Sequence, residues 1–261
     1  MMQLRAAPAF AAIVCLAACH EEAQTHLARG NVLWNEGKKA SDPAKVAQAV
    51  AEYQAAAAAD PSISAPWLRL GDLFYDQGKK AQAQAAYQQA TARNPGQVDA
   101  WIGLARTQSE QGQDAAARAS LGRALEVAPK NLYARLSRAQ LALEAGDVTA
   151  ALADAKLASA IDDRDPSVLY VYGSAMLAAK DYSGAAAAFD RIAEVAPASE
   201  LAAYGRARLA AAQGKSAEAL SALKTLVARA PDQKAAIAKD PAFAALRGDP
   251  AFRDLAGPPG G

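Results

Sequence analysis

The sequence repeats itself at intervals of 34 residues. Trp67 is followed 34 positions later by Trp101, and Pro95 is followed at the same interval by Pro129. A fixed period of this length is typical of a chain built from copies of one small unit that stack against each other. Because such a unit cannot bury its apolar surface alone, the period predicts an extended array of units rather than one globular core.

One unit, residues 66–97, shows how each copy is built. Its apolar side chains recur at helical spacing, and the pattern breaks at Gly78 and again at Pro95. Glycine permits a left-handed turn at the end of a first helix, and proline ends a second helix. Gly71 is small where two antiparallel helices must cross closely, and Tyr87 supplies bulk around that crossing. The unit is therefore predicted to be a helix-turn-helix.

This unit resembles one complete tetratricopeptide repeat (TPR), a helix-turn-helix of 34 residues. The residues that carry the resemblance are Trp67, Leu70, Gly71, Phe74, Ala83, Tyr87, Ala90 and Pro95. The resemblance implies an all-α fold, a TPR α-solenoid in which the repeats stack into a right-handed superhelix.

The same register extends in both directions and predicts six repeats with twelve helices. The repeats span residues 26–63, 64–97, 98–131, 132–165, 166–199 and 200–233. In the first repeat the second helix comes seven residues late. Its Ser41, Asp42 and Pro43 predict a long turn around residues 38–45. Two later repeats are irregular: Arg135 stands where the fourth should have tryptophan, and Lys180 replaces the turn glycine of the fifth.

The pattern changes after Pro231. Asp240-Pro241-Ala242-Phe243 recurs as Asp249-Pro250-Ala251-Phe252. In each copy Asp can cap a helix that begins with Pro, while Phe faces inward. Residues 234–256 are therefore predicted to form a helical cap over the last repeat, and a docking peptide for a partner is the alternative. Residues 257–261 are expected to be a disordered tail.

The N-terminus carries features of targeting rather than of the fold. Arg5 precedes an apolar stretch, residues 6–15, that is too short to span a bilayer. The next residues, Leu16-Ala17-Ala18-Cys19, resemble the lipobox of a bacterial lipoprotein signal. The resemblance implies that residues 1–18 are a signal peptide removed before Cys19, whose sulfur then carries lipid. The alternative is an ordinary secretory signal with incidental cysteines.

The resemblance to lipoproteins also implies where the protein is found. Membrane attachment is expected through the acyl chains on Cys19, because no later apolar run approaches about 18 to 20 residues. Residues 19–25 are expected to be a polar tether. The residue after Cys19 is His20 rather than Asp, which in such lipoproteins favours the outer membrane. The array is then expected to face the periplasm.

Charge and composition argue against several functions. The chain has 28 Lys and Arg against 27 Asp and Glu, and removing Arg5 with the signal peptide makes the two counts equal. Nucleic-acid binding, which requires a basic excess, is therefore not expected. His20 and His26 are the only histidines, and no metal-binding spacing, nucleophile motif or phosphate-binding loop is present. We therefore expect a protein that is not an enzyme, with no cofactor, no metal and no small-molecule substrate.

The TPR resemblance instead implies a binding groove. In that family the first helix of each repeat lines a concave face that holds an extended peptide or a partner helix. The predicted groove residues, which should point away from the second helix of their own repeat, are Asn31, Trp34, Arg69, Asp72, Tyr75, Arg106, Tyr133, Gln140, Tyr170, Tyr204 and Arg208, accompanied by Asn35, Asp76, Glu110, Glu144 and Ser174. Aromatic and arginine side chains are typical of binding hot spots. The alternative is that aromatic residues such as Tyr133 and Tyr170 only fill space between repeats.

Some TPR groups grip a terminal carboxylate with a fixed set of Lys, Asn and Arg. Asn31 matches one of those positions, but Leu27 stands where the first lysine would be. The sequence therefore does not favour carboxylate capture.

A lipid anchor followed by six repeats is similar to the pilotin and assembly lipoproteins of type IV and Tad pili. This resemblance implies a scaffold that helps to localise or assemble an outer-membrane secretin or other pilus components. Two alternatives stay open: an adaptor that gathers peptidoglycan hydrolases and synthases, and a component of polysaccharide export. The motifs specify the repeat and not the partner.

Overall fold

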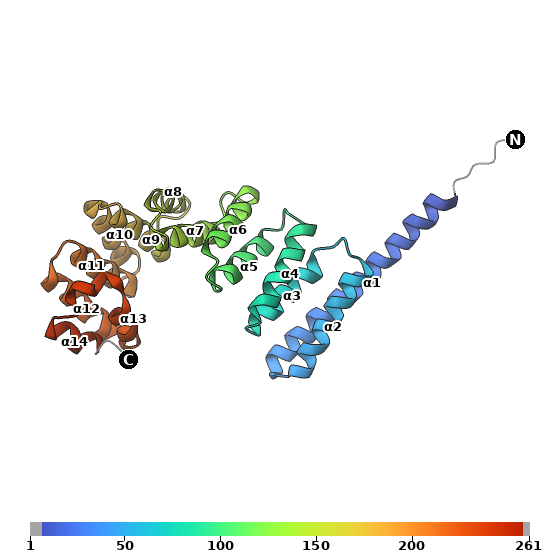
Figure 1. Cartoon of the computed structure of the whole chain (residues 1–261), viewed down its shortest axis with the longest axis horizontal. Helices are drawn as coiled ribbons and strands as arrows, with labels where there is room; N and C mark the ends of the chain where they lie inside the picture. Colours follow the sequence, from blue (N-terminus) through green and yellow to red (C-terminus); the bar gives the residue numbers. More distant parts are fainter. Residues whose placement is uncertain (1–6, 258–261) are drawn as a thin grey trace. The chain divides into compact units, whose positions relative to one another are not determined.

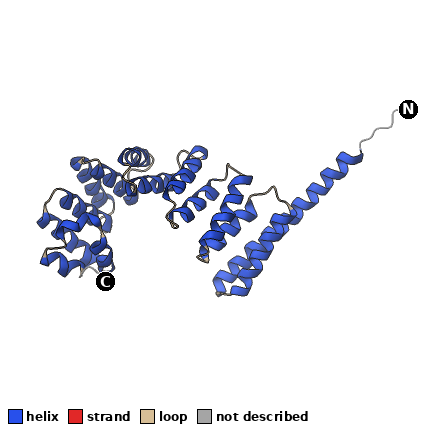
Figure 2. Ribbon diagram, in the orientation of Figure 1, coloured by secondary structure: helices blue, strands red, loops and turns tan. Residues whose placement is uncertain are grey.

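The computed structural model describes residues 7–257, and the side chains from residue 17 onward. The first six residues of the expected signal peptide and residues 258–261 of the expected tail lie outside this range. Regular structure within the range is helical throughout (Figures 1 and 2). The all-α prediction is therefore confirmed.

Twelve helices follow one another as six helix-turn-helix pairs in the described part of the chain. Their bounds are α1 (Ala7–Ala40), α2 (Pro43–Ala59), α3 (Ala65–Asp76), α4 (Lys80–Arg93), α5 (Val98–Ser109), α6 (Asp114–Val127), α7 (Leu132–Glu144), α8 (Val148–Ser159), α9 (Pro166–Ala178), α10 (Tyr182–Val195), α11 (Glu200–Ala212) and α12 (Ser216–Arg229). The chain divides into two compact units after Pro129, with α1–α6 in the first unit and α7–α12 in the second.

Left-handed turns end the first helices, as the period predicts. Gly78, Gly112, Gly146 and Gly214 have φ between 71° and 74°. Lys180 adopts the same conformation, with φ of 62°, although its Cβ makes that conformation unfavourable. The geometry of the turn is thus imposed by the packing of the two helices, even where glycine is missing.

The first repeat contains a turn that is shorter than predicted. The helix α1 continues to Ala40 and α2 begins at Pro43, so the turn is only Ser41 and Asp42. Asp42 caps α2 by accepting a hydrogen bond from the Ala44 N–H at 2.9 Å. The prediction of a long turn over residues 38–45 is wrong, because the inserted residues lengthen the helices instead. Seven residues make about two helical turns, so the apolar faces stay aligned.

The residues expected as a polar tether, 19–25, are also helical. They belong to α1, and Ala23 is fully buried. His20 Nδ1 lies 2.8 Å from Asp60 Oδ2, and His26 Nδ1 lies 2.6 Å from Glu52 Oε2. The prediction of a tether is therefore wrong: the lengthened α2 provides a surface on which this part of α1 packs.

Aromatic side chains of second helices pack against glycines of first helices. A Cβ added to Gly71 of α3 would lie 2.6 Å from the Tyr87 ring, and one added to Gly103 of α5 would lie 2.5 Å from it. Tyr87 is itself fully buried. The predicted close crossing at Gly71 is confirmed, and the same ring also closes the contact with the next repeat.

The fourth repeat has a polar contact in its interior. Asp154 of α8 is 4% exposed and lies 2.7 Å from Arg138 Nε and 3.2 Å from Arg135 Nη1 of α7. Hydrogen bonding to Asp154 raises the pKa of Arg138. The arginine found where tryptophan was expected thus has a buried carboxylate as its partner.

Short helices follow the last repeat. They are η1 (Pro231–Gln233), α13 (Lys234–Lys239), η2 (Pro241–Leu246) and α14 (Pro250–Ala256). Asp240 and Asp249 each cap the helix that follows, accepting hydrogen bonds at 2.8 Å from the backbone two residues on. Phe243 and Phe252 are buried in one cluster with Leu223 and other α12 residues. This segment therefore covers the apolar end of the last repeat.

Candidate functional site

Two predicted groove residues of the first repeat contact their own second helix. Asn31 accepts a hydrogen bond from the hydroxyl of Tyr53 in α2 at 2.9 Å. Trp34 meets the edge of the same ring, with centroids 6.4 Å apart. The prediction that these side chains point away from α2 is wrong, because the buried Tyr53 reaches between them. Trp34 also lines a cavity of about 620 Å³ beside the turn between α1 and α2.

Five other predicted residues lie in a charged network around α3 and α5. Its members are Arg69, Asp72, Tyr75, Arg106 and Glu110, and Lys80 of α4 is their neighbour. The Arg106 guanidinium stacks on the Tyr75 ring at 3.6 Å, and the Tyr75 hydroxyl donates to Glu110. Lys80 Nζ lies 2.9 Å from Glu110. These contacts hold the predicted side chains together at the surface of the first unit.

Asp72 has a second role in this network. It accepts hydrogen bonds from the Tyr87 hydroxyl at 2.8 Å and from Arg69 at 3.4 Å. Burial raises the pKa of Asp72, and these hydrogen bonds oppose the increase. Since Tyr87 belongs to α4, Asp72 points partly toward its own second helix and not only into the predicted groove.

The second unit gathers five predicted residues around one cavity. This cavity, called here the groove pocket, has a volume of about 530 Å³ and is lined by Gln140, Leu143, Glu144, Tyr170, Ser174, Leu177, Ala178, Arg208, Ala212, Pro241 and Ala242. Its walls come from α7, α9 and α11, which are three successive first helices, and from η2. Five of these lining residues were predicted: Gln140, Glu144, Tyr170, Ser174 and Arg208. The predicted Tyr133, in contrast, is 53% exposed and lies outside the lining.

Hydrogen bonds fix one wall of the groove pocket. Arg208 Nη1 donates to the Tyr170 hydroxyl at 3.1 Å, and Arg208 Nε lies 3.6 Å from Asp240 Oδ2. The Tyr204 hydroxyl donates to the same Asp240 oxygen at 2.6 Å, and the Tyr204 ring stacks on Tyr170 with centroids 6.1 Å apart. Burial is the main cause that raises the pKa of Tyr204. The predicted side chains of Tyr170, Tyr204 and Arg208 are thus held in place.

The prediction from sequence missed the contribution of the C-terminal segment. Asp240 ties Arg208 and Tyr204 to η2, whose Pro241 and Ala242 line the groove pocket. The repeated Asp-Pro-Ala-Phe motif marked this segment, but its packing beside the first helices depends on the folded chain.

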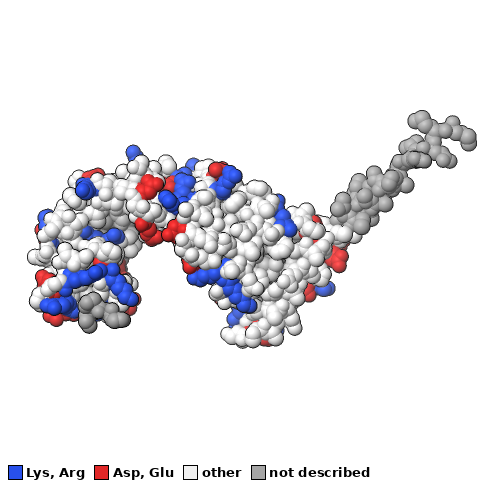
Figure 3. Space-filling view, in the orientation of Figure 1, with Lys and Arg blue, Asp and Glu red and all other residues white. Residues whose placement is uncertain are grey.

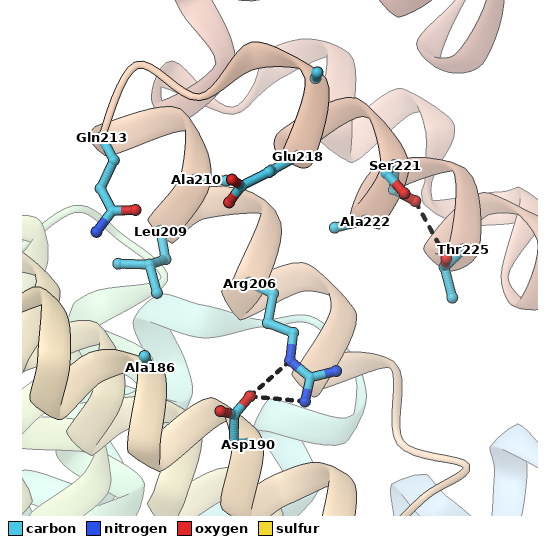
Figure 4. Close-up of a pocket in the computed structure, with 11 residues that line it drawn as sticks. Ala186, Asp190, Arg206, Leu209, Ala210, Gln213, Glu218, Ser221, Ala222 and Thr225 are labelled. Carbon is cyan, nitrogen blue, oxygen red and sulfur yellow. Dashed lines mark hydrogen bonds and ion pairs between the residues drawn. The ribbon is translucent and has the colours of Figure 1, made fainter.

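A second cavity, of about 560 Å³, lies between α10, α11 and α12 (Figure 4). Arg206 donates from Nε and Nη2 to Asp190 Oδ1 at 2.9 and 2.7 Å. The other walls of this cavity are formed mainly by small side chains, such as Ala186 and Ala222. None of the predicted groove residues lines this cavity, which the sequence had not indicated.

The described residues offer little for metal chemistry. They contain no cluster of three or more His, Cys, Asp or Glu side chains placed to hold a metal ion.

Basic and acidic side chains are interspersed on the face shown in Figure 3. Cys19 is partly exposed on α1. Over the same described range, no helix combines the length and apolar character that a bilayer span requires.

The chain belongs to the tetratricopeptide repeat family. The family model matches residues 74–141 and 176–249, which together make up more than half of the chain. The protein is therefore a TPR scaffold for protein–protein interactions. A search of curated protein sequences gave no significant match.

Solved TPR structures share the fold. A tetratricopeptide repeat protein from Parabacteroides merdae ATCC 43184 aligns with a TM-score of 0.70 at 17% identity, covering 87% of this chain and 89% of its own. PilW, described as a widely conserved type IV pilus biogenesis factor, aligns with a TM-score of 0.61 at 18% identity, covering 77% and 94%. YrrB, described as a TPR protein with an unusual peptide-binding site, aligns with a TM-score of 0.59 at 17% identity. The alignment covers 69% of this chain and 93% of YrrB.

Proposed function

We propose that this protein is a lipid-anchored scaffold of the bacterial cell envelope that recruits a protein partner during assembly of a pilus or secretion machine. The observation that carries the proposal is the groove pocket, where Gln140, Tyr170 and Arg208 from three successive first helices surround one cavity. In a TPR array this is the face that holds a peptide or a partner helix.

The anchor is proposed from the lipobox-like residues Leu16 to Cys19. After cleavage, the lipid-bearing residue would begin α1 directly. His20 of that helix contacts Asp60 at the end of α2, and Ala23 is fully buried. The repeats would then follow the acyl chains without an extended linker. We place the protein at the outer membrane, facing the periplasm, because His20 follows the cysteine.

A role in pilus or secretion assembly is supported by the fold shared with PilW, whose description names type IV pilus biogenesis. The partner would be a secretin or another component of the machine. A catalytic role has less support, because the charged side chains on one wall of the groove pocket, Arg208 and Asp240, are paired with each other.

One experiment in cells tests both parts of the proposal. The anchor is tested by Cys19→Ser, which removes the acyl acceptor and should move the protein out of the membrane fraction. Fractionation followed by immunoblotting measures this, with Ser41→Ala as a control that leaves Cys19 intact. If Cys19→Ser stays in the membrane pellet, anchoring by lipid is wrong.

The partner is tested by photo-crosslinking in the same cells. A benzophenone amino acid replaces Tyr170 in the groove pocket and, as the control, Glu194 on α10, whose side chain is 65% exposed. We expect crosslinks from position 170 to a secretin or pilus subunit, identified by mass spectrometry. Crosslinks to peptidoglycan hydrolases or synthases would support the adaptor alternative instead. Crosslinks from position 194 only would refute the assignment of the binding face.

A further inference from the structure

We infer that the groove pocket recognises a peptide segment in which a large apolar side chain is next to lysine or arginine. This inference rests on the proposed binding role of the same face and specifies the partner's chemistry. Three features of the pocket support it: its apolar walls, a buried hydroxyl without a partner and an unbalanced negative charge.

Apolar side chains form much of the pocket wall. Leu143, Leu177, Ala178 and Ala212 come from three first helices, and Pro241 and Ala242 add to them from η2. The volume of about 530 Å³ lies within the range of roughly 300–1,000 Å³ that is typical of ligand sites. A large apolar side chain together with its adjoining main chain fits such a space.

Ser174 gives the pocket a polar group without a partner. Ser174 is only 8% exposed and lines the cavity, and its Oγ forms no hydrogen bond. Buried hydroxyl groups in native proteins are nearly always hydrogen-bonded. A hydroxyl both donates and accepts, and a peptide main chain offers both kinds of group. A bound segment would therefore supply the missing partner.

The charges of the pocket favour a basic occupant. Arg208 is balanced by Asp240 at 3.6 Å. Glu144, in contrast, accepts a hydrogen bond from the Gln140 amide at 2.9 Å and has no cation within 4.0 Å among the described residues. The lining therefore carries one unmatched carboxylate, which a lysine or arginine next to the apolar side chain would neutralise.

The cavity of Figure 4 also has apolar walls, but it lacks the unpartnered hydroxyl and the unmatched carboxylate. Asp190 is paired with Arg206 at 2.7 Å, and Glu218 is paired with Lys215 at 3.4 Å. None of its lining side chains is a buried polar group without a partner. It therefore serves as the control site for the groove pocket.

The test uses fluorescein-labelled synthetic peptides and the full chain in detergent, with binding measured by fluorescence polarisation. The three peptides share a Gly- and Ser-rich frame with a central Leu-Lys, Leu-Glu or Ser-Lys pair. We expect the Leu-Lys peptide to bind most tightly. Reversing the charge with Glu144→Lys should weaken its binding about tenfold and favour Leu-Glu, since like charges in an interface are costly. The control Glu218→Lys should leave the order of the three peptides unchanged.

A second variant separates binding from folding. Ser174→Ala removes a hydroxyl that forms no hydrogen bond in the unbound protein, so the melting temperature should be unchanged or slightly raised. Binding of the Leu-Lys peptide should weaken about fivefold, on the scale of one lost hydrogen bond. Equal binding of all three peptides, or a preference that survives Glu144→Lys, would overturn the inference. If position 170 still crosslinks a partner in cells, the proposed function stands even though the inferred peptide specificity is wrong.

Discussion

At the scale of single residues, the most unusual side chain is Asp154. It is almost fully buried in the fourth repeat, where it holds Arg138 and Arg135 of the facing helix. Other second helices have Ala or Ser at the same position of the 34-residue period, such as Ala86 and Ser120. The ion pairs therefore occupy a position that small uncharged side chains fill in those repeats, which makes this repeat depend on keeping both charges.

Substituting Asp154→Ala should strongly destabilise the second unit. The change leaves two arginines without the carboxylate on which their burial depends, and breaking a buried pair costs about 3–5 kcal/mol. The matched control is Asp190→Ala, which removes an ion pair with Arg206 whose side chains are 60% and 47% exposed. Such an exposed pair contributes less than about 1 kcal/mol. Urea unfolding of both variants measures the difference, and similar losses would show that the Asp154 pair is not effectively buried.

At the scale of elements, one position of the second helix is complementary in size to the residues that it faces: its side chain is large where they are small, and small where they are larger. Tyr87 lies between Gly71 and Gly103, and Phe189 likewise lies between two glycines, Gly173 and Gly205. In the fourth repeat the equivalent residue is Ala155, and it clusters with the larger Ala139 and Val171. A large side chain on the second helix thus faces glycines, and a small side chain faces larger residues, so the total side-chain volume at each helix crossing stays similar.

The close fit of the Tyr87 ring against Gly103 predicts the effect of Gly103→Ala. The added Cβ would lie 2.5 Å from the Tyr87 ring, so the variant should lose about 1–3 kcal/mol through overpacking. Tyr87→Leu should relieve the clash, and Gly103→Ala should cost less in that background. Gly248→Ala is the control, since a Cβ there has no neighbour within 4 Å, and a change within about 0.5 kcal/mol is expected. Strictly additive losses in the double variant would rule out the proposed fit.

At the scale of the whole molecule, stability is expected to be a sum of contacts between neighbouring repeats. The last repeat has no following repeat, and its apolar end is covered by the segment from η1 to α14. Phe243 and Phe252 of that segment share a cluster with Leu223 and Leu226 of α12. The same segment also supplies Asp240 and two residues of the groove pocket wall.

Removing the Phe243 ring should therefore loosen the last repeat. The side chain is fully buried, and Phe243→Ala should cost about 3–5 kcal/mol. Hydrogen exchange should become faster in α11 and α12. Tyr133→Ala is the control, because that ring is 53% exposed and its loss should change stability little. Unchanged exchange in Phe243→Ala, together with a loss of partner binding, would favour the docking-peptide alternative for this segment.

The period, the helix pairs and the tight crossings can all be predicted from the amino-acid sequence. Glycine at the turns, proline after the second helices and the pairing of Gly71 with Tyr87 are local or strictly periodic features, so they can be located without coordinates. The sequence also predicted Gln140, Tyr170 and Arg208, because a fixed helical register determines which side chains share a face.

Which of the predicted side chains surround a cavity depends on contacts that form only in the folded chain. Asn31 and Trp34 contact the buried Tyr53. Arg208, in contrast, donates a hydrogen bond to Tyr170 and is paired with Asp240, which lies more than 30 residues further along the chain. Likewise, the seven extra residues of the first repeat could have formed a loop or longer helices. The helices formed because α1 and α2 bury each other's added turns. Register along one helix is a local property, but burial and charge balance depend on residues that only folding brings together.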